Sequence, residues 1–97
     1  MYKGLDPLLL SQVRLAVMSC LMVAREAEFN VIKEKTGATA GNLSVQIGKL
    51  QEAGYLRVEK TYKNNYPLTV CRLTGEGIAA FEAFYKDLQM YFDSGKE

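Results

Sequence analysis

A chain of 97 residues is long enough for one small domain, so we expect a single domain over residues 1–97. Hydrophobic residues make up 48% of the chain and charged residues 24%, which excludes an intrinsically disordered protein. The formal net charge is only +1, and the sequence lacks histidine, the commonest general base and metal ligand. It also lacks a phosphate-binding loop and a convincing nucleophile–base pair, so we expect no enzymatic activity, no cofactor and no metal.

The two cysteines, Cys20 and Cys71, lie 51 positions apart and form neither a zinc-binding pattern nor a C-x-x-C motif. A reducing, cytoplasmic setting is the simpler interpretation, and a single disulfide is the alternative. Both residues fall on apolar faces of the expected elements, where cysteine usually behaves as a small hydrophobic residue. A redox-sensing role is the less favoured hypothesis.

Asp6-Pro7 predicts the start of a first helix from Pro7 to Ala24, because Asp caps free backbone amides and Pro fits the first turn. The apolar residues of this helix form more than one stripe, so it must be covered on several sides. A chain of this length has little material for that, which is a first indication of a dimer. The apolar run 15–24 is too short for a membrane span, and Arg14 argues against a signal peptide, so we expect no membrane partner.

Two further helices follow, with a tight turn between them. Asn30 is the expected N-cap of a short helix over residues 31–36, and Gly37 is a natural C-terminal stop. Thr39 is the expected cap of a third helix over residues 40–53.

Residues 55–73 change from a helical period to alternation. Leu56–Lys60 and Leu68–Leu73 predict two strands, and Lys63–Pro67 has the composition of a somewhat long turn. We therefore expect a β-hairpin in this part of the chain.

Thr74 is the expected cap of the last helix, which runs over about residues 75–92 and carries a strongly aromatic stripe. The stripe is wider than one domain face requires, so we expect the first and last helices to form a dimer interface. A pocket for a small-molecule effector, lined by the same aromatic residues, is the alternative. The predicted interface residues are Leu9, Val13, Val17, Phe81, Phe84, Tyr85, Leu88, Tyr91 and Phe92.

The element order gives residues 29–53 the shape of a helix-turn-helix, with the hairpin 55–73 as a wing. Two segments carry a family resemblance, namely Leu43-Ser44, Ile47, Leu50 with Gly54-Tyr55-Leu56, and Leu73-Thr74-Gly75-Glu76-Gly77. Over about residues 5–92 the chain resembles small single-domain winged-helix regulators of the multiple-antibiotic-resistance (MarR) and arsenic-repressor (ArsR) types. The resemblance implies a mainly α fold with a β-hairpin wing (α+β), and additional N- and C-terminal helices for dimerisation.

The third helix carries a small, polar and nearly uncharged surface opposite its core face. At 100° per residue, Leu43, Ile47 and Leu50 share the core face. Amides and hydroxyls on the other faces suit base edges in a major groove, and an ordinary solvated face is the alternative. Glycine inside a helix costs about 1 kcal/mol relative to alanine. Close approach to DNA explains Gly41 and Gly48, and a loosely constrained first turn or packing against a neighbour are the alternatives.

The charge distribution favours the same surface. Residues 39–73 hold five basic and two acidic side chains, a net charge of +3, whereas residues 74–97 carry −3. A positive charge suits contact with DNA phosphates, so we expect residues 39–73 to face DNA. The negative charge of residues 74–97 suits a position away from DNA. The hairpin tip has one cation and no arginine, which is fewer than the resemblance implies. The predicted DNA-binding residues are Thr39, Gly41, Asn42, Ser44, Val45, Gln46, Lys49, Lys60, Lys63 and Asn64.

These patterns predict a sequence-specific, double-stranded DNA-binding transcriptional regulator that acts as a homodimer. The third helix would enter the major groove, and the wing would lie on the DNA backbone. A winged helix that binds another protein and has no specific DNA site is the alternative, because a fold does not determine its function.

Overall fold

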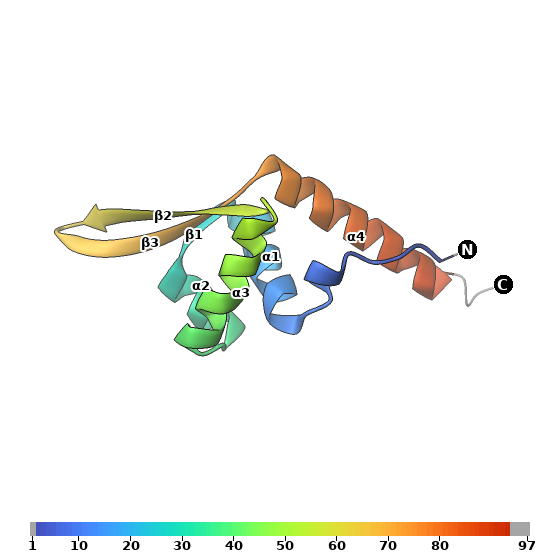
Figure 1. Cartoon of the computed structure of the whole chain (residues 1–97), viewed down its shortest axis with the longest axis horizontal. Helices are drawn as coiled ribbons and strands as arrows, with labels where there is room; N and C mark the ends of the chain where they lie inside the picture. Colours follow the sequence, from blue (N-terminus) through green and yellow to red (C-terminus); the bar gives the residue numbers. More distant parts are fainter. Residues whose placement is uncertain (1, 94–97) are drawn as a thin grey trace.

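The computed structural model describes residues 2–93, which form helices and a three-stranded antiparallel sheet whose hairpin projects away from the helices (Figure 1). In chain order the elements are the 3₁₀ helix η1 (Pro7–Leu9), α1 (Gln12–Ala24), β1 (Glu26–Glu28), α2 (Phe29–Thr36), α3 (Ala40–Glu52), β2 (Leu56–Lys63), β3 (Tyr66–Leu73) and α4 (Gly75–Asp93). This is a winged-helix α+β fold, which confirms the predicted fold class. No helix within residues 2–93 is long and apolar enough to cross a membrane.

Helix α1 is the centre of the core, because it contacts α2, α3, β1 and β3. The buried hydrophobic residues are Leu9, Val17, Met18, Leu21, Ile32, Leu43, Ile47, Leu50, Leu56, Cys71 and Phe84. The chain itself therefore covers the side of α1 that carries Val17, Met18 and Leu21.

The first helix is shorter than predicted, because η1 and α1 are two separate helices with Leu10 and Ser11 between them. The Asp6 carboxylate accepts a hydrogen bond from the Leu8 amide at 3.0 Å and starts η1. The Ser11 hydroxyl accepts one from the Arg14 amide at 3.3 Å and starts α1. Two caps so close together replace the single helix from Pro7 to Ala24 with two separate starts.

The three-residue strand β1 was not predicted. It pairs antiparallel with β3, which lies between β1 and β2 in the sheet. Glu26 stands opposite Arg72, and their side chains form an ion pair at 2.8 Å. Strand β1 therefore joins the end of α1 to the base of the wing.

Helix α2 begins at Phe29, two residues earlier than predicted, with Glu28 as its extended cap residue. Asn30 lies inside the first turn, so its predicted role as N-cap is wrong. Glu28 belongs to β1, and the direct passage from strand to helix leaves no room for a separate capping residue.

The turn between α2 and α3 agrees with the prediction. Gly37 adopts the left-handed conformation, with φ of 71°, and its amide donates to the Lys33 carbonyl at 3.0 Å. The Thr39 hydroxyl accepts a hydrogen bond from the Asn42 amide at 3.2 Å and caps α3. The short turn places α3 directly after α2, as in a helix-turn-helix.

The wing is a regular hairpin with a tighter tip than predicted. Lys63 pairs with Tyr66, so only Asn64 and Asn65 form the turn. Their φ values of 52° and 66° are both positive, as a two-residue type I′ turn requires. Asparagine tolerates this conformation better than most residues, which explains why the strands extend beyond the expected boundaries.

Helix α4 leaves the core at a junction that we call the neck, made of Gly54, Tyr55, Thr74 and Gly77. The Thr74 hydroxyl donates to the Gly54 carbonyl at 2.6 Å and accepts from the Gly77 amide at 3.0 Å, so Thr74 caps α4 as predicted. The Thr74 amide donates to the Tyr55 carbonyl at 3.2 Å. A Cβ atom on Gly77 would lie 2.1 Å from that carbonyl oxygen, so only glycine permits this approach.

The wing and α4 extend from the core in opposite directions, and the N-terminal residues run along α4 (Figure 1). The molecule measures 58 × 25 × 21 Å and has a radius of gyration of 14.9 Å. A compact domain of 100 residues has a radius of gyration of about 13 Å, so the shape is elongated. The Tyr91 hydroxyl donates to the Lys3 carbonyl at 2.6 Å, and the Tyr2 ring stacks on the Tyr91 ring at 4.7 Å.

Candidate nucleic-acid interface

Helix α3 separates its core face from its outer face as the sequence predicts. Leu43 and Leu50 are fully buried, and Ile47 is 4% exposed. On the outer side, Asn42 and Ser44 are exposed, and Val45 is 56% exposed. The remaining predicted α3 residues are Gly41 and Lys49, which are exposed, and Gln46 and Gly48, which are half-buried.

The two glycines of α3 face open space. A Cβ atom added at Gly41 or at Gly48 would meet no other atom within 4 Å. Packing against a neighbour, the alternative explanation for Gly48, is therefore wrong. The fold does not require a glycine at either position. Gly48 lies inside α3 and weakens the helix, whereas Gly41 is the second residue of α3, in the loosely constrained first turn that the alternative explanation names.

Gln46 is held by hydrogen bonds inside the molecule. An Arg14 guanidinium nitrogen donates to Gln46 Oε1 at 2.5 Å, and Gln46 Nε2 donates to Asn42 Oδ1 at 3.0 Å. Arg14 Nε also donates to the Leu8 carbonyl at 2.6 Å. We call Arg14, Gln46 and Asn42 the amide network. It brings an arginine of α1 to the outer flank of α3, which the sequence did not predict.

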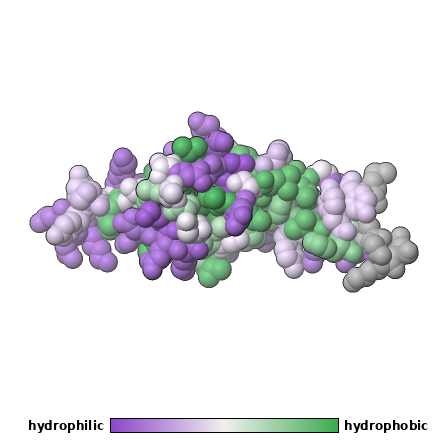
Figure 2. All heavy atoms as spheres, turned by 90° about the horizontal axis from the view of Figure 1, so that it is seen from below, coloured by the Kyte–Doolittle hydropathy of each residue, from purple (hydrophilic) through white to green (hydrophobic). Residues whose placement is uncertain are grey.

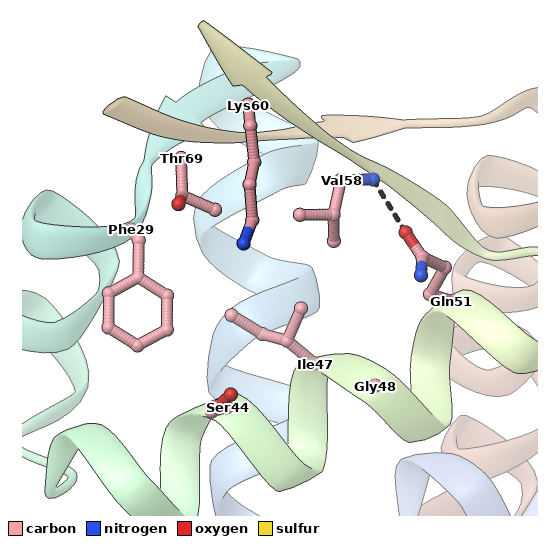
Figure 3. Close-up of a pocket in the computed structure, with 8 residues that line it drawn as sticks. All are labelled: Phe29, Ser44, Ile47, Gly48, Gln51, Val58, Lys60 and Thr69. Atoms are coloured by element: carbon pink, nitrogen blue, oxygen red, sulfur yellow. Dashed lines mark hydrogen bonds between the residues drawn. The ribbon is translucent and has the colours of Figure 1, made fainter. Parts of the chain in front are cut away.

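A cleft of about 360 Å³ lies between α3 and the wing (Figure 3). The Lys60 side chain descends from β2 into this cleft, with its ammonium group directed toward α3 (Figure 3). The Gln51 side chain accepts a hydrogen bond from the Val58 amide at 2.8 Å and connects the end of α3 to the wing. The cleft therefore places a positive charge beside the outer side of α3.

The basic side chains of the wing differ in the side of the hairpin on which they lie and in whether an acidic residue already pairs with them. Side chains alternate along β2, so Lys60 shares the α3-facing side with Val58, and Lys63 points to the opposite side of the hairpin. Arg72 pairs with Glu26 at 2.8 Å and with Glu59 at 3.1 Å. The hydrogen bond and charge of Glu59, with the charge of Glu26, raise the pKa of Arg72. The two carboxylates thus balance the positive charge of Arg72, which adds little to the positive electrostatic potential of the wing surface.

Two predicted contacts at the ends of this surface already have structural roles. The Thr39 oxygen caps α3, which leaves its hydroxyl proton and one lone pair for other partners. Asn64 occupies a positive-φ position of the hairpin turn. Both residues remain exposed.

Cys71 is unsuited to rapid thiol chemistry. Cys71 is fully buried, and burial raises the pKa of its thiol to about 11. Cys20 is half-buried, and neither residue forms a disulfide. Nucleophilic and redox reactions of cysteine proceed through the thiolate, so this environment favours the predicted role of Cys71 as a small hydrophobic core residue.

The predicted dimer residues fall into three groups. Leu9, Val17 and Phe84 are buried in the core of the chain, so we remove them from the predicted contact surface. Val13, Phe81 and Leu88 are half-buried. Tyr85, Tyr91 and Phe92 remain exposed, with Tyr85 at 60% and Phe92 at 70%. Figure 2 shows hydrophobic atoms gathered over the centre and the α4 end and hydrophilic atoms over the wing end.

Residues 13–92 match the family model described as "Winged helix DNA-binding domain". The chain belongs to this family. The match begins in α1 and ends near the end of α4, so it includes the helix-turn-helix, the wing and the neck.

Three relatives place this winged-helix chain among known proteins. It is 33% identical over 81 residues to an uncharacterised protein of Methanocaldococcus jannaschii, with 82% of this chain and 88% of the relative covered. It is similar to the structure of a transcriptional regulator homologue from Pyrococcus horikoshii OT3, with a TM-score of 0.86, 29% identity and coverage of 92% and 88%. A MarR-family transcriptional regulator from Silicibacter pomeroyi has a TM-score of 0.70 at 19% identity, with 91% of this chain and 58% of that chain covered, and so shares the fold.

Proposed function

We propose that this protein is a sequence-specific transcriptional regulator that binds double-stranded DNA as a homodimer. Helix α3 enters the major groove, and the wing lies along the adjacent backbone. The observation that carries the proposal is the outer side of α3, where two glycines stand although the fold has open space at both positions. A helix without Cβ atoms there lets the backbone come close to the floor of a groove.

The chemistry of the neighbouring side chains suits the same partner. Ser44 and Asn42 supply a hydroxyl and a carboxamide, which can hydrogen-bond to base edges, and Val45 supplies an apolar group for a thymine methyl. Lys60 stands beside them in the cleft and suits a phosphate. Polar contacts for bases and a cation for the backbone are thus adjacent on one side of the molecule.

The proposed homodimer uses the exposed aromatic face of α4. Tyr85 and Phe92 are the most exposed predicted interface residues, and a groove of about 300 Å³ lies beside them, lined also by Leu88. The corresponding groove and ring of a second copy would fill each other in a two-fold arrangement, in which the same patch serves both subunits. Such a dimer presents two α3 helices to half-sites about 10 bp apart or a multiple of that distance.

The deciding experiment is selection of bound duplexes from a randomised DNA pool at moderate salt. We expect enrichment of a pseudo-palindrome whose half-site spacing reports the separation of the two α3 helices. Retention without sequence enrichment would contradict specific recognition, and no retention at low salt would contradict DNA binding altogether.

A comparison of alanine variants at Lys60 and at Arg72 tests where the DNA backbone lies. We expect Lys60→Ala to weaken binding to all duplexes similarly and to lower the slope of log K against log salt by about one. Arg72→Ala removes the same charge and is the matched control. It should leave the slope unchanged, because Arg72 is held by Glu26 and Glu59 on the opposite side of the hairpin and makes no phosphate contact in the proposed complex. Equal effects of the two variants on the slope would contradict the assignment of the α3-facing side of the wing.

Sedimentation velocity tests the dimer. We expect a dimer for the wild-type protein at micromolar concentration and a monomer for the double variant Tyr85→Ser with Phe92→Ser. Tyr62→Ser in the wing is the control, because Tyr62 is equally exposed but lies away from α4. A wild-type monomer at these concentrations would overturn the proposed assembly.

Binding to another protein is the second candidate function. Tyr62 and Tyr66 are 76% and 73% exposed at the wing tip, and tyrosine is enriched at protein interfaces. This function predicts no salt-dependent affinity for duplexes, so the selection experiment separates it from the leading proposal.

A further inference from the structure

We infer that Arg14 is a positioning residue that determines which bases the α3 helix recognises. It does so by fixing the orientation of the Gln46 and Asn42 carboxamides through the amide network. The inference rests on the proposed DNA-binding function and adds a residue of α1 to the determinants of specificity.

Arg14 is itself held in place at two points. Its Nε donates to the Leu8 carbonyl at 2.6 Å, and its Nη1 donates to Gln46 Oε1 at 2.5 Å. Both hydrogen bonds involve half-buried groups, where water competes less for the donors. The planar guanidinium makes both contacts at once, which the single ammonium group of a lysine cannot reproduce in the same geometry.

The hydrogen bond from Arg14 determines which way the Gln46 carboxamide faces. With Oε1 directed to the guanidinium, Nε2 points toward Asn42 and donates to its Oδ1 at 3.0 Å. The two residues are four positions apart and therefore share one flank of α3. The network thus transmits one orientation from Arg14 to Gln46 and from Gln46 to Asn42.

This orientation leaves mainly donors available to DNA. A carboxamide has two N–H groups and one carbonyl oxygen with two lone pairs, and each oxygen here is already oriented toward a donor inside the molecule. The two N–H groups of Asn42 and the second N–H of Gln46 remain, together with one lone pair on each oxygen. Bidentate recognition of adenine requires the amide oxygen to accept from N6, whereas guanine N7 and O6 and thymine O4 are acceptors. The network therefore favours guanine or thymine edges and disfavours adenine at the bases next to this flank.

The test compares base preferences from the randomised-duplex selection for wild type, Arg14→Ala, Gln46→Ala and the double variant. We expect the wild-type site to show guanine or thymine at the contacted positions of each half-site. Arg14→Ala frees the Gln46 oxygen and should change the ratio of adenine to guanine there about fivefold or more, which is the lower range for one bidentate contact. Because Arg14 acts through Gln46, the double variant should show the same base preferences as Gln46→Ala alone.

Two controls separate positioning from general effects on charge or folding. Arg14→Lys keeps the positive charge but cannot make both hydrogen bonds, so it should shift the base preference in the same direction as Arg14→Ala. Arg57→Ala removes an exposed arginine of β2 outside the network and should leave the preference unchanged. Circular dichroism and urea unfolding identify any variant that fails to fold.

The outcomes distinguish this inference from the proposed function. A wild-type protein that enriches no sequence overturns both. An enriched wild-type site whose base preferences are unchanged in Arg14→Ala and Arg14→Lys overturns the inference alone, as does a double variant whose effects on base preference are the product of the two single effects. That last result would assign Arg14 a direct contact with DNA.

Discussion

Helices α3 and α4 both contain glycines, but the surroundings of these glycines differ. At Gly77 of α4 the space for a Cβ atom is filled by the Tyr55 carbonyl oxygen at 2.1 Å, so the fold itself requires glycine. A Cβ atom at Gly48 of α3 would have nothing within 4 Å. The fold therefore requires the glycine at Gly77 and does not require the one at Gly48, for which the proposed close approach to DNA supplies a reason.

The exposed faces of the two helices differ in the same sense. Helix α3 buries three residues of 13 and presents hydroxyl, amide and small side chains outward. Helix α4 buries two residues of 19 and presents tyrosine and phenylalanine. Polar groups suit the base edges of DNA, and aromatic rings suit a protein surface. The comparison therefore assigns one outer helix to each of the two proposed partners.

The largest expected effect comes from Gly77→Ala. The added methyl group would collide with the Tyr55 backbone and force α4 away from the neck, so we expect a loss of about 3 kcal/mol in the free energy of unfolding. Urea unfolding followed by circular dichroism measures it. Gly75→Ala, two residues earlier in α4 and with open space around it, is the matched control and should be close to neutral. Equal stability of the two variants would contradict the close packing at the neck.

A smaller loss is expected from Tyr55→Phe at the same junction. The Tyr55 hydroxyl donates to the Asp6 carboxylate, and this bond, with burial and the charges of Asp6 and Glu76, raises the pKa of Tyr55 from 10.0 to about 12. Loss of a hydrogen bond to a charged group should cost about 1–2 kcal/mol at neutral pH.

The pH dependence sharpens this prediction. The folded state holds the phenolic proton more tightly than the unfolded chain, so the contribution of Tyr55 is complete below pH 10 and is lost as the pH rises toward about 12. The stability difference between wild type and Tyr55→Phe should therefore shrink over this interval. A constant difference up to pH 12 would show that the Tyr55 pKa is not raised by the fold.

The smallest change in stability, and the one of opposite sign, is expected from Gly48→Ala. Alanine favours the helix by about 1 kcal/mol, and the site has space for the methyl group, so the protein should become more stable. The same variant should bind the selected DNA site about tenfold more weakly, a difference of about 1.4 kcal/mol. Ser19→Ala, at an exposed position of α1, is the control and should leave DNA affinity unchanged. Unchanged affinity of Gly48→Ala would remove the close approach of α3 to DNA.

Local periodicity explains what the sequence predicted well. The core face of α3 follows from apolar residues at helical spacing, and the limits of α4 were predicted to within one residue, because Thr74 and the aromatic stripe are local signals. The hairpin was found from alternation, although its turn is shorter than expected, because two adjacent asparagines provide positive φ at both positions.

Features that depend on distant residues were missed or misjudged. Strand β1 has three residues, too few for a periodic signal, and it exists because β3 pairs with it. The Arg14–Gln46 bond joins residues 32 positions apart, and no local pattern specifies that distance. An arginine that interrupts an apolar helix is the signal that could have indicated a polar partner in the fold. The burial of Leu9 and Val17 likewise depends on the three-dimensional arrangement of the other elements.

The neck lies between the wing and α4, so the length of the wing strands and the length of α4 can change independently of each other. Hydrogen bonds from Thr74 to Gly54 and Tyr55 close the base of the hairpin, so α4 starts from the same place whatever the length of the strands. Removing one cross-strand pair near the tip would shorten the reach of the wing by about 3.3 Å and leave the path of α4 unchanged. In the proposed dimer, lengthening α4 would change the separation of the two copies without altering the wing. The proposed contact with DNA and the proposed spacing of half-sites could therefore change independently of each other.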